Sequence, residues 1–397
     1  MFLTLDVWLS HFPPLHLSKE EFTKRLVITY VSPQTLHEII SLAPKSSGRP
    51  LLATSDKRYT NRTLIVDVFY SIIIENRQDY LSQFFNNYLS ILHTDWTPLN
   101  IKNDGIINSA KRDKSKQIIR NLFYLELLRD TIITNSVKSE CSFMKTLTLI
   151  FNDLVLVDRL FAPSSIDLIL RAPRNFFYLI QSYQPKASIL NPFTIKFLLD
   201  EYPGKSLFTP VLSWGAYLLA FEHSAYSEYV GVDVMESVCD KVKLLASNTK
   251  SVSIINSQSE LMPPEFTTKY VSHFDLIIVC PPYFDMEIYS EGHQSTSEYP
   301  SYAEWLQKYW RPTVALCRTV INEGGIFIVI VNNYQSLRGH YYDLQHDLHK
   351  ITADYFHLFE ICPLTNRKSS LRITKRDRGE SAFFYRRKCL KQRSISK

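Results

Sequence analysis

Glycine is scarce in the first half of this sequence, and long apolar runs are absent from all of it. Only Gly48 and Gly105 of the ten glycines precede residue 200. Because glycine permits tight turns and close approach of the backbone to a ligand, we expect backbone-mediated chemistry in the second half. No apolar run approaches the roughly 20 residues that cross a bilayer. The longest strand-like run, 326–331, has six residues, so we expect no membrane-spanning helix.

Paired cysteines and a leader sequence are also missing. Six cysteines are present, and none forms a C-x-x-C pair. This argues against a disulfide framework or a thiolate zinc site and favours a reducing intracellular compartment, the cytoplasm or the nucleus. The apolar N-terminus lacks a basic segment and contains Asp6, so we expect no signal peptide. His273, His293 and His340 are not at metal-ligand spacing, and no metal is expected.

The positive charge is concentrated near the C-terminus. The chain of 397 residues carries a net charge of +6, but residues 367–397 hold 12 Lys and Arg against two acids, a local net of +10. The remainder is therefore at −4. Such a segment favours contact with a nucleic-acid backbone, and a solvated loop and tail is the alternative.

The pattern of apolar residues changes near residue 185. Before it, apolar positions recur at helical spacing in 64–74, 80–92 and 117–133, and Ser18 with Glu21 forms a capping-box pattern. We expect loops at 44–56 and 96–108. The length suggests two domains: a mainly helical one over 1–184 and a second over 185–388, followed by a basic tail, 389–397.

After residue 185, predicted strands and helices alternate. The strands are expected at 208–213, 229–234, 251–256, 274–280, 326–331, 357–362 and 382–386, with helices at 216–224, 236–248, 302–321 and 342–355. This alternation predicts an α/β fold with a doubly wound, mostly parallel sheet that binds ligands at the carboxyl ends of its strands.

The predicted strand 274–280 runs into Cys280-Pro281-Pro282-Tyr283-Phe284. The two prolines fix the backbone and remove two N–H donors, so carbonyl groups and an aromatic ring face the mouth of the sheet. A carbonyl can accept a hydrogen bond from an amine, and an aromatic ring can stack on a planar group. The segment would therefore suit a planar ligand that carries an amine. A simple loop that ends the strand is the alternative interpretation.

This motif resembles the Pro-Pro-(Tyr/Phe/Trp) motif of S-adenosylmethionine-dependent amino-methyltransferases. The continuation through Asp285, Glu287 and Tyr289, the pair Gln294-Ser295 and the aromatic stretch 299–310 are similar to DNA methylases of phages and large DNA viruses. The resemblance covers about 185–388. It implies a Rossmann-like class I methyltransferase domain, S-adenosylmethionine as cofactor, and methylation of adenine N6 or cytosine N4 in DNA. The N-terminal half would then recognise the target.

The resemblance also implies roles for single residues. Tyr283 would stack on the flipped base, and the Pro281 carbonyl and Cys280 would accept from its amine, flanked by Pro282 and Phe284. Asp233 would bind the ribose of the cofactor, and Glu260 its adenine. The remaining cofactor contacts would come from two segments, Asn191-Pro192-Phe193 and Ser213-Trp214-Gly215, and from Thr209. Gly324-Gly325 matches the Gly-Gly turn that precedes a later strand in this family.

Three positions depart from the family pattern. Thr209 stands where an acid is expected, Ser213 where glycine is usual, and Cys280 where Asp, Asn or Ser is usual. An alternative function is therefore a catalytically inactive, methyltransferase-like nucleic-acid-binding or scaffold protein. Methylation of RNA or of a protein glutamine is a second alternative. A nucleophilic role for Cys280, as in C5-pyrimidine methylation, is disfavoured because that motif places proline before the cysteine. In the aromatic stretch, helical spacing favours core packing over base stacking.

Overall fold

The computed structural model describes residues 15–27, 62–89, 95–112, 115–123, 144, 147–148, 189–285, 293–336, 339–365 and 379–388. The chain divides into two compact units. One comprises 91–124 and 188–397 together with the first two residues, and the other comprises 3–90 and 125–187. Residues 91–124, which sequence reasoning placed in the N-terminal domain, therefore group with the second half. The predicted loop 44–56 and the tail 389–397 lie outside the described residues.

The described part of the second unit is helical. It contains α2 (Lys19–Val27), α4 (Arg62–Tyr70), the π-helix η2 (Ser71–Glu75) and α5 (Arg77–Leu89). The predicted capping box is confirmed: the N–H of Glu21 donates to Ser18 Oγ at 3.2 Å, and the N–H of Ser18 donates to Glu21 Oε2 at 3.1 Å. The rings of Phe22 and Tyr70 meet edge-on at 5.6 Å and join α2 to α4.

The other unit is built on a nine-stranded sheet in the order β1-β2-β10-β11-β7-β6-β3-β4-β5. Its strands are β1 (Lys102–Asn103), β2 (Ile106–Asn108), β3 (Ser206–Thr209), β4 (Glu228–Asp233), β5 (Ser251–Asn256), β6 (Phe274–Val279), β7 (Ile321–Val331), β10 (Phe356–Thr365) and β11 (Ser381–Arg387). β3 to β7 are mutually parallel, and β11 is antiparallel to both β7 and β10. A separate hairpin pairs β8 (Tyr334–Gln335) with β9 (Tyr341–Tyr342).

The strand order identifies the fold. Without β1 and β2, and numbered along the chain, the strands of the large sheet stand in the order 3-2-1-4-5-7-6, with the seventh antiparallel. This is the arrangement of the Rossmann-like class I methyltransferase fold, and it confirms the predicted α/β class. In such sheets ligands bind beyond the carboxyl ends of the strands, where the order reverses.

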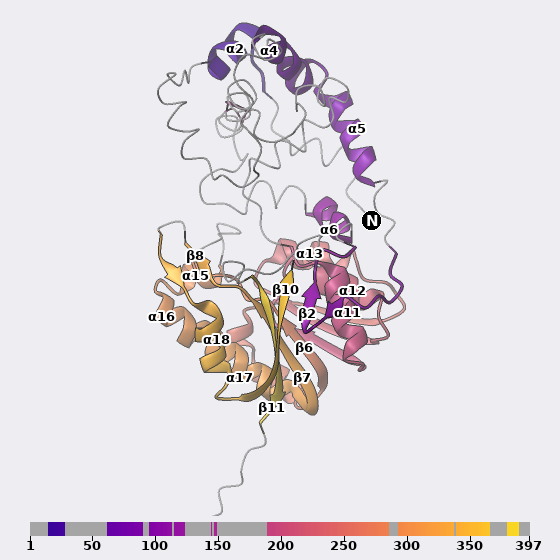
Figure 1. Ribbon diagram of the computed structural model, residues 1–397, viewed down its shortest axis with the longest axis vertical. Coiled ribbons are helices and arrows are strands. Elements are labelled where there is room, and N and C mark those ends of the chain that lie inside the picture. The colour runs from indigo at the N-terminus through magenta and orange to yellow at the C-terminus, as the bar shows by residue number, and fades with distance from the viewer. Residues whose placement is uncertain are drawn as a thin grey trace, which may run out of the picture. The chain divides into compact units, whose positions relative to one another are not determined.

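Helices cover both faces of this sheet (Figure 1). The helices described in this unit are α6 (Lys116–Leu122), α11 (Pro192–Glu201), α12 (Ala216–Glu222), α13 (Glu236–Lys243), η5 (Ser259–Leu261), α14 (Pro264–Lys269), α15 (Ser295–Glu298), α16 (Tyr302–Glu304), the π-helix η6 (Trp305–Trp310), α17 (Arg311–Val320) and α18 (Leu344–Thr352). The central strands β3 and β6 are almost completely buried, as is the second half of β7, whereas β5 at the edge of the sheet has no buried residue. The core on the α17 and α18 face is one continuous cluster that reaches from Phe208 to Tyr385.

Two expectations about the second half are corrected. The predicted loop 96–108 contains β1 and β2, because the edge of β10 offers them a partner: Leu364 of β10 lies opposite Ile107. The predicted turn at Gly324-Gly325 lies inside β7, which begins at Ile321. The pairing with β6 moves from Ile321 directly to Ile326, so the glycines occupy an irregular stretch of the strand.

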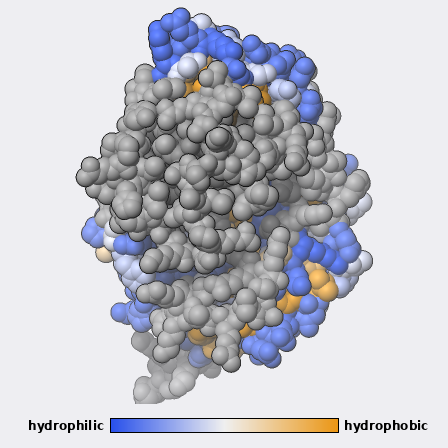
Figure 2. Space-filling model, turned by 45° about the horizontal axis from the view of Figure 1, so that its top comes forward, coloured by the Kyte–Doolittle hydropathy of each residue, from blue (hydrophilic) through white to orange (hydrophobic). Residues whose placement is uncertain are grey.

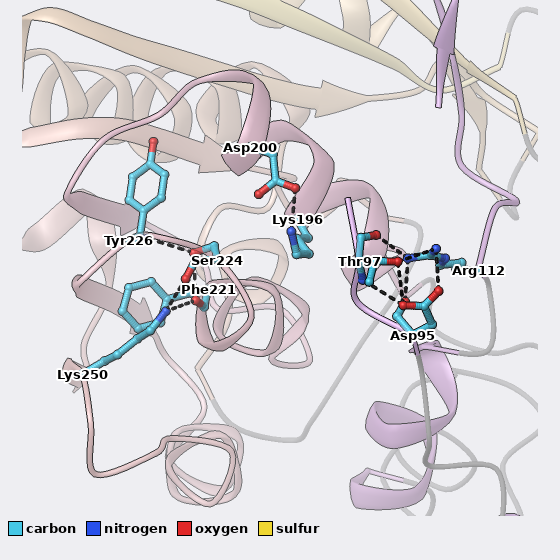
Figure 3. Close-up of polar contacts among 9 residues, drawn as sticks. All are labelled: Asp95, Thr97, Arg112, Lys196, Asp200, Phe221, Ser224, Tyr226 and Lys250. Atoms are coloured by element: carbon cyan, nitrogen blue, oxygen red, sulfur yellow. Dashed lines mark hydrogen bonds and ion pairs between the residues drawn. The ribbon is translucent and has the colours of Figure 1, made fainter. Parts of the chain in front are cut away.

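Polar contacts between Arg112 and residues Asp95 and Thr97 hold the segment 95–112 together (Figure 3), and ring contacts pack it against α11 and the end of α12. Arg112 donates to the carbonyls of Asp95 at 2.7 Å and Thr97 at 2.5 Å, and its guanidinium lies 4.5 Å from the ring centre of Phe193. Trp96 stacks on His223 at 4.2 Å. The segment is therefore built into the sheet unit and is not a free connection.

The described surface is mostly hydrophilic in the view of Figure 2, with hydrophobic side chains in small separate groups. Small, separate groups of exposed apolar side chains are normal at protein surfaces. Within the described ranges, no helix combines the length and the hydropathy needed to cross a bilayer.

Candidate active site at the carboxyl edge of the sheet

The loop between β3 and α12 has an unusual backbone. Ser213 has φ = 55° and Gly215 has φ = 83°, both in the left-handed region. The backbone conformation favours glycine at 215, and a Cβ there, 2.9 Å from Leu245 Cδ1 and 3.2 Å from Val242 Cγ2, would also require those side chains to shift. The N–H of Leu212 donates to the Val232 carbonyl at 2.8 Å, which holds the loop against the end of β4.

Thr209, the last residue of β3, has its hydroxyl engaged within the protein. Its Oγ1 lies 2.7 Å from the hydroxyl of Tyr229, and both side chains are fully buried. The position where the resemblance implies an acid is therefore a neutral, internally bonded pair.

Asp233 ends β4 and faces the same loop. Its Oδ1 accepts from the N–H of Met235 at 3.0 Å. Burial raises the pKa of Asp233 to about 7, although the nearby N–H groups of Met235, Leu212, Val234 and Ser213 favour the ionised form. The Asp233 carbonyl accepts from Ser257 N–H at 2.9 Å, which joins the end of β4 to the chain beyond β5.

Glu260 lies in η5, just beyond β5. Its Oε1 accepts from the hydroxyl of Tyr299 at 3.2 Å. Burial raises the pKa of Glu260, and the bond from Tyr299 opposes this shift. Two carboxyl groups, Asp233 and Glu260, thus follow the two outermost parallel strands on this side of the sheet.

The Pro-Pro segment beyond β6 is held at three points. The N–H of Cys280 donates to the Tyr217 hydroxyl at 2.8 Å. The Tyr283 hydroxyl accepts from the N–H of Asn332, just beyond β7, at 2.7 Å. The hydroxyl of Tyr334 donates to the Phe284 carbonyl, and its ring stacks on that of Tyr283 at 5.1 Å. Pro281 and Phe284 are buried, whereas Cys280, Pro282 and Tyr283 are half-buried.

A cavity of about 430 Å³ opens beside this segment. Its walls are aromatic and polar, and they are formed by Phe284, Asp285, Thr296, Pro300, Ser301, Tyr302, His340 and Tyr342. A larger hollow of about 630 Å³ lies among α13, β5 and α14, and none of the predicted site residues lines it.

Asn191, predicted as a cofactor contact, is placed in the scaffold. It is buried, caps α11 by accepting from Phe193 N–H at 3.0 Å, and also accepts from Ser115 Oγ at 2.7 Å. Its amide donates to the carbonyls of Ser109 and Lys111, each at 2.8 Å. These four bonds use the full capacity of the amide. Pro192 begins α11, and Phe193 and Trp214 are buried.

The predicted residues therefore fall into two groups: those that lie at the edge of the sheet where a ligand would bind, and those, such as Asn191 and Thr209, whose side chains are engaged inside the protein. The structure brings Ser213, Gly215, Asp233, Glu260 and the segment 280–284 to one edge of the sheet, because the strands that precede them are parallel. Tyr217 and Tyr334, which hold the Pro-Pro segment, were not predicted. Nothing in the sequence marks them, since their partners are 63 and 50 residues away.

The histidines and aromatic residues around the motif are mostly structural. His273 Nε2 lies 2.8 Å from Glu228 Oε2. Trp305, Tyr309 and Trp310 are buried, as predicted for core residues. Within the residues that the structure describes, no cluster of three or more His, Cys, Asp or Glu could hold a metal ion.

Comparisons with known proteins give only distant similarities. No family model matches the chain, and no curated protein sequence matches it significantly. Solved structures that resemble it include TrmN from Thermus thermophilus (14% identity, TM-score 0.34), which covers 51% of this chain and 50% of that one. The match to N-methyltransferase NodS from Bradyrhizobium japonicum (11% identity, TM-score 0.33) covers 49% of this chain and 92% of that one. The match to a TehB-like SAM-dependent methyltransferase from Corynebacterium glutamicum (11% identity, TM-score 0.32) covers 56% of this chain and 99% of that one. Because these similarities are so low, the fold is assigned from the strand order, and the chemistry is argued from the residues of the site.

Proposed function

We propose that this protein transfers a methyl group from S-adenosylmethionine to an exocyclic amine of a DNA base, adenine N6 or cytosine N4. One observation carries the proposal. The glycine loop, two carboxyl groups and the Pro-Pro-Tyr segment lie at the carboxyl edge of one class I methyltransferase sheet.

The residues at the ends of β3, β4 and β5 suit the proposed cofactor. S-adenosylmethionine supplies an electrophilic methyl group when bound. The backbone of Ser213 to Gly215 would approach its amino-acid end, and a carboxylate at Asp233 would accept from its two ribose hydroxyls. Glu260 would accept from the adenine amine. The donor set fits, because ionised carboxylates only accept hydrogen bonds and the ribose and amine offer donors.

The Pro-Pro segment would position the acceptor. The target base must leave the helical stack to reach it. The Tyr283 ring, held by Tyr334 and Asn332, would stack on the base, and the Pro281 carbonyl would accept from the amine and so direct its lone pair at the methyl group. The cavity that Phe284, Tyr302 and Tyr342 help to line adjoins this segment. Catalysis of this kind rests on positioning and exclusion of water.

DNA contact is proposed from the basic segment 367–397, of which the structure describes only 379–388. Three basic residues in that part are engaged with the protein. Arg386 lies 4.9 Å from the Phe359 ring centre, Arg387 donates to the Ile321 carbonyl at 3.0 Å, and Lys388 donates to the Ala353 carbonyl. Contact with phosphates is therefore assigned to the rest of the segment.

An inactive binding protein is the second candidate, and two observations favour it. Thr209 leaves no carboxylate at the end of β3, and a thiol at Cys280 is a weak hydrogen-bond acceptor. Cofactor binding without methyl transfer would be the result expected from this candidate.

The deciding experiment is mass spectrometry of nucleosides in DNA from methylase-deficient cells that express the chain. We expect N6-methyladenine or N4-methylcytosine with the wild type and a loss of about 5- to 150-fold with Tyr283→Ala, because stacking contributes about 1–3 kcal/mol. Tyr283→Phe keeps the ring but loses the bond to Asn332, so it should retain part of the activity.

Two further measurements interpret a negative result. If calorimetry shows that the protein binds S-adenosylmethionine but no methylated base is found in the DNA, the result supports the inactive binding protein. Transfer of labelled methyl groups to RNA or to protein glutamine, and not to DNA, would contradict the proposed substrate. Absence of both binding and transfer would contradict the methyltransferase proposal as a whole.

A further inference from the structure

One tyrosine hydroxyl near the site is buried without a hydrogen-bond partner. Tyr309 is 3% exposed, and among the described residues no group bonds to its hydroxyl. Its neighbours on the same π-helical turn are satisfied. Trp305 Nε1 donates to Ser295 Oγ at 3.1 Å, and Trp310 Nε1 donates to the Leu348 carbonyl at 3.3 Å. On this turn, the unpartnered group is therefore that of Tyr309.

Tyr309 lies on the cofactor side of the proposed site. The turn that carries it, η6, contacts η5, which carries Glu260. Burial raises the pKa of the Tyr309 hydroxyl far above the ordinary range, and the carboxylates of Glu260 and then Asp233 add to this shift. Single π-helical turns often occur at functional sites.

The isolated hydroxyl is costly in the free protein. A buried donor without a partner destabilises the folded state, whereas a phenylalanine ring of the same shape would not. Buried polar groups without partners call for an explanation, and a ligand that supplies the missing acceptor is one.

We propose that the Tyr309 hydroxyl donates a hydrogen bond to a ring nitrogen of a bound 6-aminopurine nucleoside, next to Glu260, which accepts from its 6-amino group. This inference rests on the proposed cofactor. Adenine presents an amino donor beside a ring-nitrogen acceptor. A tyrosine donor beside a carboxylate acceptor complements that edge, and Tyr299 keeps the Glu260 carboxylate in place by donating to its other oxygen.

The test compares Tyr309→Phe with a matched control, Tyr226→Phe. Tyr226 is also buried, but its hydroxyl donates to the Tyr202 carbonyl. Affinity is measured by calorimetry with S-adenosylhomocysteine, and stability by thermal unfolding without ligand. We expect Tyr309→Phe to weaken binding by about 5- to 20-fold with an equal or higher unfolding temperature. Tyr226→Phe should do the opposite: keep the affinity and lower the unfolding temperature.

The 6-oxo analogue S-inosylhomocysteine probes the whole amino and ring-nitrogen edge. It places a carbonyl where the amino group was and a proton on the neighbouring ring nitrogen, so the wild type should bind it at least tenfold more weakly than S-adenosylhomocysteine. Unchanged affinity in Tyr309→Phe, with the wild type binding normally, would overturn the role of Tyr309 and leave the proposed cofactor intact. Failure of the wild type to bind S-adenosylhomocysteine at all would overturn both.

Discussion

The hydroxyl oxygen of Tyr217, in α12, accepts a hydrogen bond from the backbone N–H of Cys280 at 2.8 Å. This N–H is the last donor before the two prolines. Tyr217 is fully buried, and burial raises its pKa well above the ordinary value, so the hydroxyl stays neutral. The helix that follows the glycine loop thus also positions the Pro-Pro-Tyr segment, and it couples the proposed cofactor half of the site to the proposed acceptor half.

Replacement of Tyr217 by phenylalanine should affect catalysis more than cofactor binding. Tyr217→Phe leaves the Cys280 N–H without its acceptor, which costs about 1–3 kcal/mol of stability. The Pro-Pro segment then loses one of its three fixed points, so we expect a lower rate of methyl transfer at saturating S-adenosylmethionine with little change in cofactor affinity.

Tyr385→Phe is the control for this variant. The Tyr385 hydroxyl lies 3.1 Å from His349 Nδ1, and the residue is buried in β11. It should lose comparable stability and keep its rate. Equal losses of rate in both variants would mean that Tyr217 acts only through general stability.

Much of the sheet could be predicted because most of its strands appear in the sequence as local runs of apolar residues. The bounds of β5 agree with the prediction, and β6 ends one residue earlier than expected. β1 and β2 could not be predicted in this way. They have two and three residues, and β2 pairs with β10 through a contact between Ile107 and Leu364 that is distant in sequence.

Cofactor affinity should depend on pH through Asp233. Its carboxyl must be ionised to accept from ribose hydroxyls, and burial raises its pKa to about 7. We therefore expect the affinity for S-adenosylhomocysteine to rise between pH 6 and about 8 and then to level off, in calorimetric titrations over pH 5.5–8.5. Asp233→Asn should bind more weakly above pH 7 and lose this dependence. A wild-type profile identical to that of Asp233→Asn would contradict the assignment.

The same shift has a defined effect on stability. The folded pKa of Asp233 lies above the unfolded value of about 4. The folded state therefore holds a proton that the unfolded state has released, and stability should fall as the pH rises from about 4 to about 7. Asp233→Asn should remove this part of the decline in unfolding temperature.

The candidate site was predictable where one residue follows one strand, and less so where distant segments meet. Asp233 and the segment 280–284 follow β4 and β6, and topology alone brings them to one edge. The role of Asn191 depends on Ser109, Lys111 and Ser115, more than 70 residues earlier in the chain. No local pattern shows that these groups saturate its amide.

The glycine loop offers a test that needs no activity. Ser213 is held at φ = 55°, which costs a residue with a Cβ about 1–2 kcal/mol relative to glycine. Ser213→Gly should therefore raise the urea midpoint, by an amount that corresponds to about 1 kcal/mol. Gly215→Ala should lower it, because Gly215 has φ = 83° and a Cβ would lie 2.9 Å from Leu245 Cδ1. A lower midpoint for Ser213→Gly would show that the serine side chain itself stabilises the loop.

Cys280 gives the sharpest test of mechanism, because the backbone around it is fixed independently of its side chain. Tyr217 binds the Cys280 N–H, and Tyr334 donates to the Phe284 carbonyl. A substitution at 280 therefore changes the chemistry more than the chain path. An Asn or Asp oxygen accepts from the target amine better than a thiol does, and it follows the charge that develops on nitrogen. We expect Cys280→Asn and Cys280→Asp to keep or raise the rate of methyl transfer, by up to roughly tenfold. A covalent mechanism through the thiol predicts the reverse: both variants inactive, and Cys280→Ser nearly so. Nucleoside mass spectrometry of DNA treated with each variant separates the two mechanisms.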